Sequence, residues 1–174
     1  MQNRTLRQIT AAGVIAAAYA AISLVLATIT FGPVQCRISE ALTLLPVISP
    51  AAIWGVTLGC AVTNGVGAAT GTNFLGLVDL PVGTAATLLA AVLTRLLGKI
   101  RFGGLPWLSA LPPILINAVA IGGEWCYAMT GSINGAFWVF AGQIALGQLP
   151  PCLLGVWLIH LLERRGLQNI IEGK

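Results

Sequence analysis

Long uncharged segments alternate with short polar breaks along this chain of 174 residues. Residues 41–78 and 125–159 contain no Asp, Glu, Lys, Arg or His. As one α-helix, residues 41–78 would extend for about 57 Å, whereas the hydrocarbon core of a bilayer is about 30 Å thick. The pattern therefore predicts that this segment crosses a membrane more than once.

Proline and polar breaks divide the chain into helices. Pro46 and Pro50 would each remove a backbone hydrogen bond from a single helix over residues 37–68, so two helices are predicted there. The other breaks are polar or glycine-rich, at residues 70–73, 98–104 and 130–135. Six transmembrane helices, the second of them short, are predicted over residues 8–31, 37–48, 51–68, 78–98, 112–129 and 136–163.

The first apolar segment follows two arginines, which is also how a secretory signal begins. It stays uncharged from Gln8 to Cys36, far beyond the length of a signal-peptide core. We therefore expect it to remain as the first transmembrane helix.

The composition predicts an all-α integral membrane protein. Hydrophobic residues make up 57% of the chain and charged residues 8%, against roughly 25% charged residues in soluble domains. Six helices and tight loops use nearly the whole length, so we expect residues 1–174 to form a single membrane-embedded domain. The four cysteines form no CxxC or Cys–His pattern, so we expect small apolar packing residues and no metal or redox cofactor.

The basic residues orient the predicted helices. Six crossings with a cytoplasmic N-terminus place eight of the nine basic residues inside, whereas five crossings would place two clusters outside. Cytoplasmic N- and C-termini are therefore predicted, and the net charge of +4 needs no nucleic-acid partner. The eight residues are Arg4, Arg7, Arg95, Lys99, Arg101, Arg164, Arg165 and Lys174.

Three acidic residues fall in the predicted helices toward the outer leaflet: Glu40, Asp79 and Glu124. A carboxylate at the centre of a membrane span costs about 2.5–3.5 kcal/mol on insertion scales, so each needs a partner or a use. Glu124 lies near the helix end that disfavours an acid, far from any basic residue, which favours a binding role. For Glu40 and Asp79 the alternative is stabilisation of a helix N-terminus, with Arg37 pairing with Glu40.

Amide and aromatic side chains near these carboxylates could bind a planar, nitrogen-rich solute, because amides both donate and accept and aromatic faces stack. The alternative is that the aromatic residues form an interfacial belt. Asn117 and Gln148 are interpreted as hydrogen-bonding residues between helices. The candidates are Asn64, Asn73, Trp125, Tyr127, Trp138 and Gln143.

Small residues recur every four positions on the first helix, at Ala12, Ala16 and Ala20. Gly13, Ala17 and Ala21 form a parallel row beside them. Such faces let another helix approach closely, either in a partner protein or within the same chain. The sequence shows no nucleophile–base pair, metal motif or phosphate loop, so enzymatic activity is not expected.

Several segments resemble the QueT family, and the resemblance covers nearly the whole chain. The most specific is FGPVQCRISEALTLLP at residues 31–46, followed by PAAIWG at 50–55 and LGCAVTN at 58–64. Asp79 with GTAATLLAA at 83–91, and LPPILINA at 111–118, extend the resemblance.

The resemblance implies a substrate-binding S component of an energy-coupling factor (ECF) transporter, multi-pass in the cell membrane, with six helices and a short second one. It further implies that Ala12, Ala16 and Ala20 dock on a transmembrane T component driven by two cytoplasmic ATPases. The substrate would bind from outside, and reorientation would release it inside. The lipid bilayer surrounds such a protein, and no cofactor is implied.

The implied substrate is a 7-deazaguanine, a queuosine precursor, and three outer carboxylates favour 7-aminomethyl-7-deazaguanine because an ammonium needs a counter-ion. Glu124 and Glu40 would be the two binding carboxylates, with Asp79 as a third ligand or support, beside Arg37 and Asn73. Asn64 and Gln143 would contact the ring edge, and Trp125 or Trp138 would stack. An S component for another small amine or vitamin, and a membrane interaction subunit without transport activity, remain alternatives.

Overall fold

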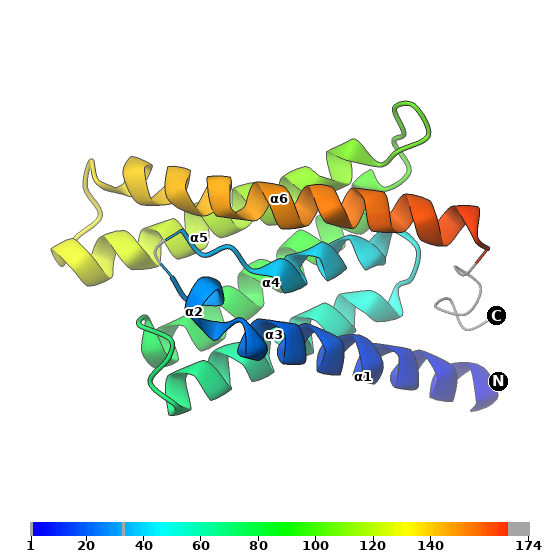
Figure 1. Ribbon diagram of the computed structural model, residues 1–174, viewed down its shortest axis with the longest axis horizontal. Helices are drawn as coiled ribbons and strands as arrows, with labels where there is room; N and C mark the ends of the chain where they lie inside the picture. The colour runs from blue at the N-terminus through cyan, green and yellow to red at the C-terminus, as the bar shows by residue number, and fades with distance from the viewer. Residues whose placement is uncertain (1, 33, 167–174) are drawn as a thin grey trace.

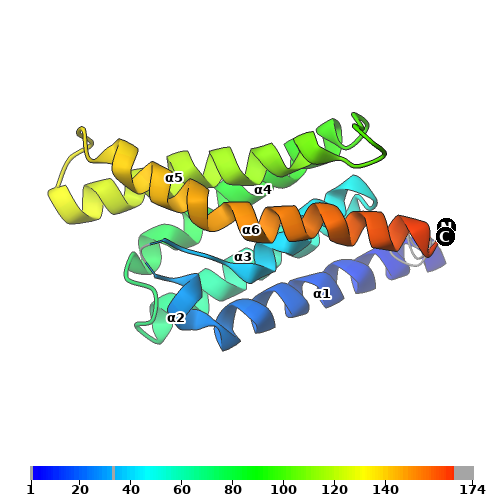
Figure 2. The ribbon, with the colours of Figure 1, turned by 45° about the horizontal axis from the view of Figure 1, so that its top comes forward.

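The computed structural model describes residues 2–32 and 34–166, and the described part is helical. Figures 1 and 2 show long helices that run roughly side by side between two ends of the molecule. The α-helices are α1 (Gln2–Val25), α2 (Ala27–Thr30), α3 (Ala51–Ala69), α4 (Asp79–Leu97), α5 (Leu111–Thr130) and α6 (Phe137–Arg164). The 3₁₀ helices are η1 (Ile38–Val47), η2 (Gly76–Val78) and η3 (Trp107–Ala110).

Five of the six predicted helices match within about two residues, and the first one differs. The prediction of one helix over residues 8–31 is wrong, because α1 begins at Gln2 and ends at Val25, and the short α2 follows. The Thr30 hydroxyl donates to the Ser23 carbonyl at 2.9 Å, so this oxygen is satisfied without a continuous helix.

Five helices are long and apolar enough to cross a membrane, and η1 is a sixth, shorter apolar helix. The chain is therefore a multi-pass membrane protein, while the count of six crossings stays a prediction. The proline argument for two elements over residues 37–68 is confirmed, since η1 ends at Val47 and α3 begins at Ala51.

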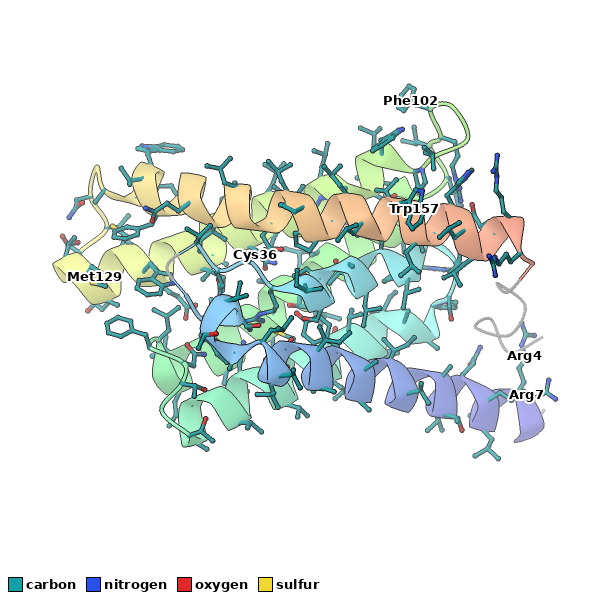
Figure 3. The ribbon with its side chains drawn as sticks, in the orientation of Figure 1. Arg4, Arg7, Cys36, Phe102, Met129 and Trp157 are labelled. Carbon is teal, nitrogen blue, oxygen red and sulfur yellow. The ribbon has the colours of Figure 1, made fainter. Side chains whose placement is uncertain are left out.

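The basic clusters gather at one end of the molecule. Arg4 and Arg7 lie at the same end as Phe102, which follows Arg101, and Met129 lies at the opposite end (Figure 3). Arg101 and Glu163 form an ion pair at 2.6 Å there. We call this the basic end, and the positive-inside rule predicts that it is cytoplasmic. Lys174 lies outside the described residues.

The short helix η1 lies at the centre of the packing. α1 packs against α3, α3 against α4, α4 against α5, and α5 against α6, whereas η1 contacts α6, α4, α1 and α3. Leu44 of η1 is fully buried in the largest apolar cluster, together with Val56 and Ile159. An element this central fixes the positions of its neighbours, and it begins at the polar residues described below.

Small residues bring α1 and α3 close together. A Cβ atom on Gly55 would lie 3.0 Å from the Ala12 carbonyl oxygen, and one on Gly59 would lie 3.0 Å from that of Ala16. Ala12 and Ala20 are buried. The predicted row of alanines therefore faces α3 of the same chain, which is the intramolecular alternative considered above. The parallel row, Gly13, Ala17 and Ala21, is exposed.

Candidate functional site

Arg37 is the centre of a buried polar cluster between the two ends of the bundle. It directly precedes η1, and only 4% of its surface is exposed. One guanidinium nitrogen donates to Asn64 Oδ1 at 3.1 Å and lies 4.0 Å from Asp79 Oδ2. The guanidinium carbon lies 5.5 Å from the Phe31 ring centroid, a cation–π distance. A buried arginine held this closely has a fixed orientation.

Asp79 is the carboxylate partner of Arg37. It is the first residue of α4 and is fully buried. Asn73 Nδ2 donates to Asp79 Oδ2 at 2.7 Å, and Asn64 Nδ2 donates to the Asp79 carbonyl at 3.0 Å. A Cβ atom on Gly83 would lie 2.5 Å from Asp79 Oδ1, so a glycine at this position leaves room for the carboxylate. The loop after α3 and the start of α4 are thereby joined at one acid.

Glu40 pairs with a tyrosine on α1 and not with Arg37. The Tyr19 hydroxyl donates to Glu40 Oε1 at 2.6 Å, and both residues are buried. The alternative in which Arg37 merely pairs with Glu40 is wrong, because the ion-pair partner of Arg37 is Asp79. The second Glu40 oxygen, Oε2, has no hydrogen-bond partner within the described residues.

A small polar cavity lies between η1, α4, α5 and α6. Its volume is about 10 Å³, which is about one water-sized sphere. Four of its polar side chains each carry a buried atom without a hydrogen-bond partner in the described part of the chain: Gln35 Oε1, Arg37 Nε, Glu40 Oε2 and Gln148 Oε1. Its lining residues are Gln35, Arg37, Glu40, Gly83, Thr87, Asn117, Ile121 and Gln148. We call it the inner cavity.

Glu124 continues this site toward the end opposite the basic end. It lies one helical turn beyond Ile121, so the two residues share a face of α5. Both Glu124 carboxylate oxygens are buried without a partner in the described residues. A hollow of about 320 Å³, lined mostly by apolar residues such as Leu75 and Val78, lies beside Glu124. An unpaired buried carboxylate in a membrane protein needs a function to balance its cost.

Trp125 belongs to a row of stacked aromatic rings. Its ring centroid lies 5.1 Å from that of Phe74 and 6.4 Å from that of Phe140. Trp125 packs with Ile121, which also lines the inner cavity. Trp125 Nε1 and Gln143 Oε1 are buried atoms without partners among the described residues. This row therefore adjoins the inner cavity.

The remaining predicted site residues have other surroundings. Trp138 is 76% exposed and meets the Phe137 ring edge-on, so the structure does not bring it to the cluster. Tyr127 is 63% exposed. Asn64 and Asn73 are buried, but both use their polar atoms within the protein: Asn73 Oδ1 accepts from the Leu75 N–H at 3.1 Å. These two amides orient Arg37 and Asp79.

Sequence reasoning missed Gln35 and Tyr19, and it assigned Gln148 another role. Gln148 Oε1 has no partner in the described residues, so the interpretation of Gln148 as a hydrogen-bonding residue between helices is not supported. Gln35 has a left-handed backbone conformation, with φ at 47°, which is uncommon for a residue other than glycine. No sequence pattern marked Gln35, although Arg37 and Glu40 are close to it along the chain.

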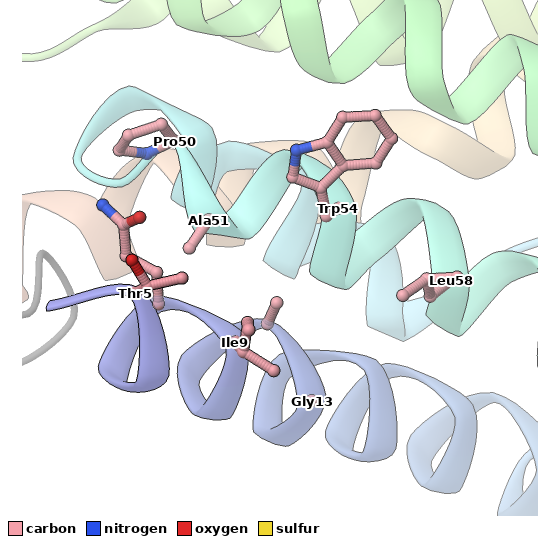
Figure 4. Close-up of a pocket in the computed structure, with 9 residues that line it drawn as sticks. Thr5, Ile9, Gly13, Pro50, Ala51, Trp54 and Leu58 are labelled. Atoms are coloured by element: carbon pink, nitrogen blue, oxygen red, sulfur yellow. The ribbon is translucent and has the colours of Figure 1, made fainter. Parts of the chain in front are cut away.

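A larger hollow lies elsewhere, between α1 and α3. This groove of about 490 Å³ is lined by Thr5, Gln8, Ile9, Ala12, Gly13, Pro50, Ala51, Trp54 and Leu58. Figure 4 shows Thr5 and Ile9 of α1 opposite Pro50 and Trp54. Among the described residues, no ionisable side chain lines the groove, so its chemistry suits an apolar partner better than a charged solute.

The comparisons with known proteins agree with the membrane architecture. The model of a family described as QueT transporter matches residues 9–164. No match was found among curated proteins or among solved structures. The matched range contains every residue of the buried polar cluster.

Proposed function

We propose, from the premise that the chain belongs to the QueT transporter family, that it is an S component that binds a queuosine precursor. The family establishes a membrane transport protein with a small-molecule substrate. The proposal adds the ECF type of transporter, the substrate class and the ATP-driven partners. The substrate is a 7-deazaguanine, and the proposed form is 7-aminomethyl-7-deazaguanine.

The observation that carries this proposal is the surplus of unpartnered acceptors in the inner cavity and on the helices that border it. Four are carboxylate oxygens, from Glu40, Asp79 and Glu124, and three are the amide oxygens of Gln35, Gln143 and Gln148. Only Arg37 Nε and Trp125 Nε1 are unpartnered donors in this group. Each buried polar atom without a partner costs about 1–3 kcal/mol. A ligand rich in N–H groups would satisfy these acceptors.

The charges of the site favour a cationic ligand. When ionised, the three carboxylates carry three negative charges, and Arg37 forms an ion pair with one of them, Asp79. An ammonium group would form a charge-assisted hydrogen bond with Glu124 or Glu40, while the other carboxylate accepts from the ring N–H. A neutral cyano analogue would leave one carboxylate without a counter-ion. Asp79 would act through Arg37, since it is already hydrogen-bonded to Asn73.

Binding requires the cavity to open, because its volume of about 10 Å³ is far smaller than a two-ring heterocycle. The segment before η1 and the loop after α3 border the site on the side away from the basic end. We propose that these segments separate to admit the substrate from outside. Release inside would follow reorientation by the ATPase partners.

The exposed face of α1 suits the proposed partner. Gly13, Ala17 and Ala21 are exposed, and the apolar groove between α1 and α3 continues this surface. A transmembrane T component, driven by two cytoplasmic ATPases, would pack its helices here in the cell membrane. Ala12 and Ala16 would support this face from beneath, because their backbone contacts α3.

Calorimetric titration of the detergent-purified chain tests the proposal. 7-Aminomethyl-7-deazaguanine should bind saturably and more tightly than the cyano analogue or guanine. Glu40→Gln and Glu124→Gln should each weaken binding of the aminomethyl compound by roughly ten- to hundredfold, as expected when a charge-assisted bond is lost. Glu163→Gln, the same chemical change at the basic end, is the matched control.

Binding that survives both substitutions would keep the family function and refute these residue roles. A folded chain that binds none of the three compounds would refute the proposed substrate. The remaining hypotheses would then be an S component for another small amine or vitamin, and a membrane interaction subunit that binds no solute.

A further inference from the structure

Gln35 and Gln148 are two buried amides that line the inner cavity. Gln35 is 3% exposed and Gln148 is 1% exposed. They come from distant parts of the chain, one before η1 and the other in the middle of α6. Both line the inner cavity, and the Oε1 atom of each has no partner within the described residues.

The backbone holds the two amides in place. A Cβ atom at Gly147, the residue before Gln148, would overlap the Val34 carbonyl oxygen and lie 3.2 Å from the Gln35 carbonyl carbon. Glycine is therefore required where α6 meets the segment that carries Gln35. At the same point Gln35 has its left-handed backbone, with φ at 47°. Such strain persists only where surrounding contacts maintain it, and it is concentrated at functional sites.

The unpartnered amide oxygens indicate which chemical group of a ligand could bind beside them. Two neutral amide oxygens accept two N–H bonds, and they supply no charge to neutralise a cation. An exocyclic aromatic amine is neutral and has two N–H donors in the plane of its ring. A ring N–H beside it can be satisfied by Glu40 in the same cavity.

We propose that Gln35 and Gln148 are the specificity-determining acceptors for an exocyclic amine on the heterocycle. This inference rests on the proposed function and refines it. It assigns the exocyclic ring amine to Gln35 and Gln148, and it leaves a carboxylate to bind the ammonium of the aminomethyl group. A site that accepts two N–H bonds rejects a ligand without them, since its own buried oxygens then stay unpaired.

A pair of ligands that differ in one group tests this assignment. We would titrate the purified chain with 7-aminomethyl-7-deazaguanine and with the matching 7-deazahypoxanthine, which lacks only the 2-amino group. The natural chain should bind the amino compound roughly ten- to hundredfold more tightly. Gln35→Leu and Gln148→Leu should reduce this ratio toward one by weakening the amino compound alone.

Three further variants separate specificity from structure. Gln148→Met repeats the test with a flexible side chain, in case the leucine does not fit. Gly147→Ala should lower the same ratio, because the added methyl displaces Val34 and with it Gln35. Glu163→Gln, a change at the basic end outside every proposed binding surface, should leave the ratio unchanged.

Thermal unfolding without ligand gives a second readout. Gln148→Leu should keep or raise the melting temperature, since it removes a buried unpaired oxygen. A structural role for Gln148 would instead lower it. A ratio unchanged in the folded Gln35 and Gln148 variants would overturn the inference and leave the proposed function intact. No binding of either ligand to the natural, folded chain would overturn the proposed function, and this inference with it.

Discussion

Two arginine–carboxylate pairs in this protein differ in almost every respect. Arg101 and Glu163 meet at 2.6 Å at the basic end, with side chains 31% and 25% exposed. A second hydrogen bond between them, at 2.7 Å, makes the pair bidentate. Arg37 and Asp79 are 4.0 Å apart in the middle of the bundle, with side chains 5% and 0% exposed.

The Arg101–Glu163 pair is closer, but it is expected to contribute less to stability than the Arg37–Asp79 pair. Arg101 and Glu163 have water as an alternative partner, so their contact adds little to stability. Arg37 Nε and Asp79 Oδ1 are buried without partners in the described residues. The other atoms of these groups are hydrogen-bonded, Arg37 to Asn64 and Asp79 to Asn73. Selection for stability alone would replace such a pair with apolar side chains. Under the proposed function, the free atoms of this buried pair are kept for the ligand, and the predictions below test that role.

The largest effect is expected from Arg37→Met. The change leaves the Asp79 carboxylate buried with Asn73 as its remaining side-chain donor, and breaking a buried pair in this way costs about 3–5 kcal/mol. Denaturant unfolding in detergent, followed by circular dichroism, would measure the loss, and titration should show no saturable binding. A loss below about 1 kcal/mol would mean that the pair is not energetically coupled.

Asp79→Asn should have the next largest effect. The amide keeps the shape of the acid but removes the charge that faces Arg37, so about 1–3 kcal/mol of stability should be lost. Affinity for the aminomethyl ligand should fall in the same protein, as measured by calorimetry. Unchanged stability together with unchanged affinity would refute the supporting role of Asp79.

Two double-substitution cycles would compare the pairs directly. For Arg37→Met combined with Asp79→Asn, the loss should be smaller than the sum of the single losses by about 0.5–3 kcal/mol, because the residues share one network. The corresponding cycle at Arg101 and Glu163 should give a coupling energy below about 1 kcal/mol. Equal coupling energies would remove the distinction between the two pairs.

Glu163→Gln should have the smallest effect. The exposed pair should contribute less than about 1 kcal/mol to the free energy of unfolding, and this contribution should shrink further at high salt. Ligand affinity should stay unchanged, since Glu163 pairs with Arg101 at the basic end and does not line the inner cavity. A large loss of binding would mean that the ligand binds near the basic end and not in the inner cavity.

Much of the fold could be predicted because the membrane imposes simple rules. Uncharged length, the prolines at positions 46 and 50, and the positions of basic residues located five of the six predicted helices correctly. The first helix was predicted wrongly, because no hydropathy pattern marks the break between Val25 and Ala27. The sequence showed two parallel rows of small residues on the first helix, but it could not show which of the two rows would face α3.

The site could be predicted only in part. Intramembrane acids are expensive, so Glu40, Asp79 and Glu124 stood out as candidates, and in the structure each has at least one buried carboxylate oxygen without a partner among the described residues. Amides and aromatic residues carry no such cost, so their pattern did not separate Gln148 from Asn64, or Trp125 from the exposed Trp138. Their roles depend on which way each side chain points.

The sequence by itself determined the membrane class, the order of the helices and the identity of the acids that need a partner. These features follow from local chemistry: hydrocarbon excludes charge, and proline ends a helix. Only the tertiary structure decided that Arg37 pairs with Asp79, that Tyr19 pairs with Glu40, and that Gln35 and Gln148 line the same cavity. Those pairings join residues far apart in the chain, and close packing at glycines such as Gly147 brings them together.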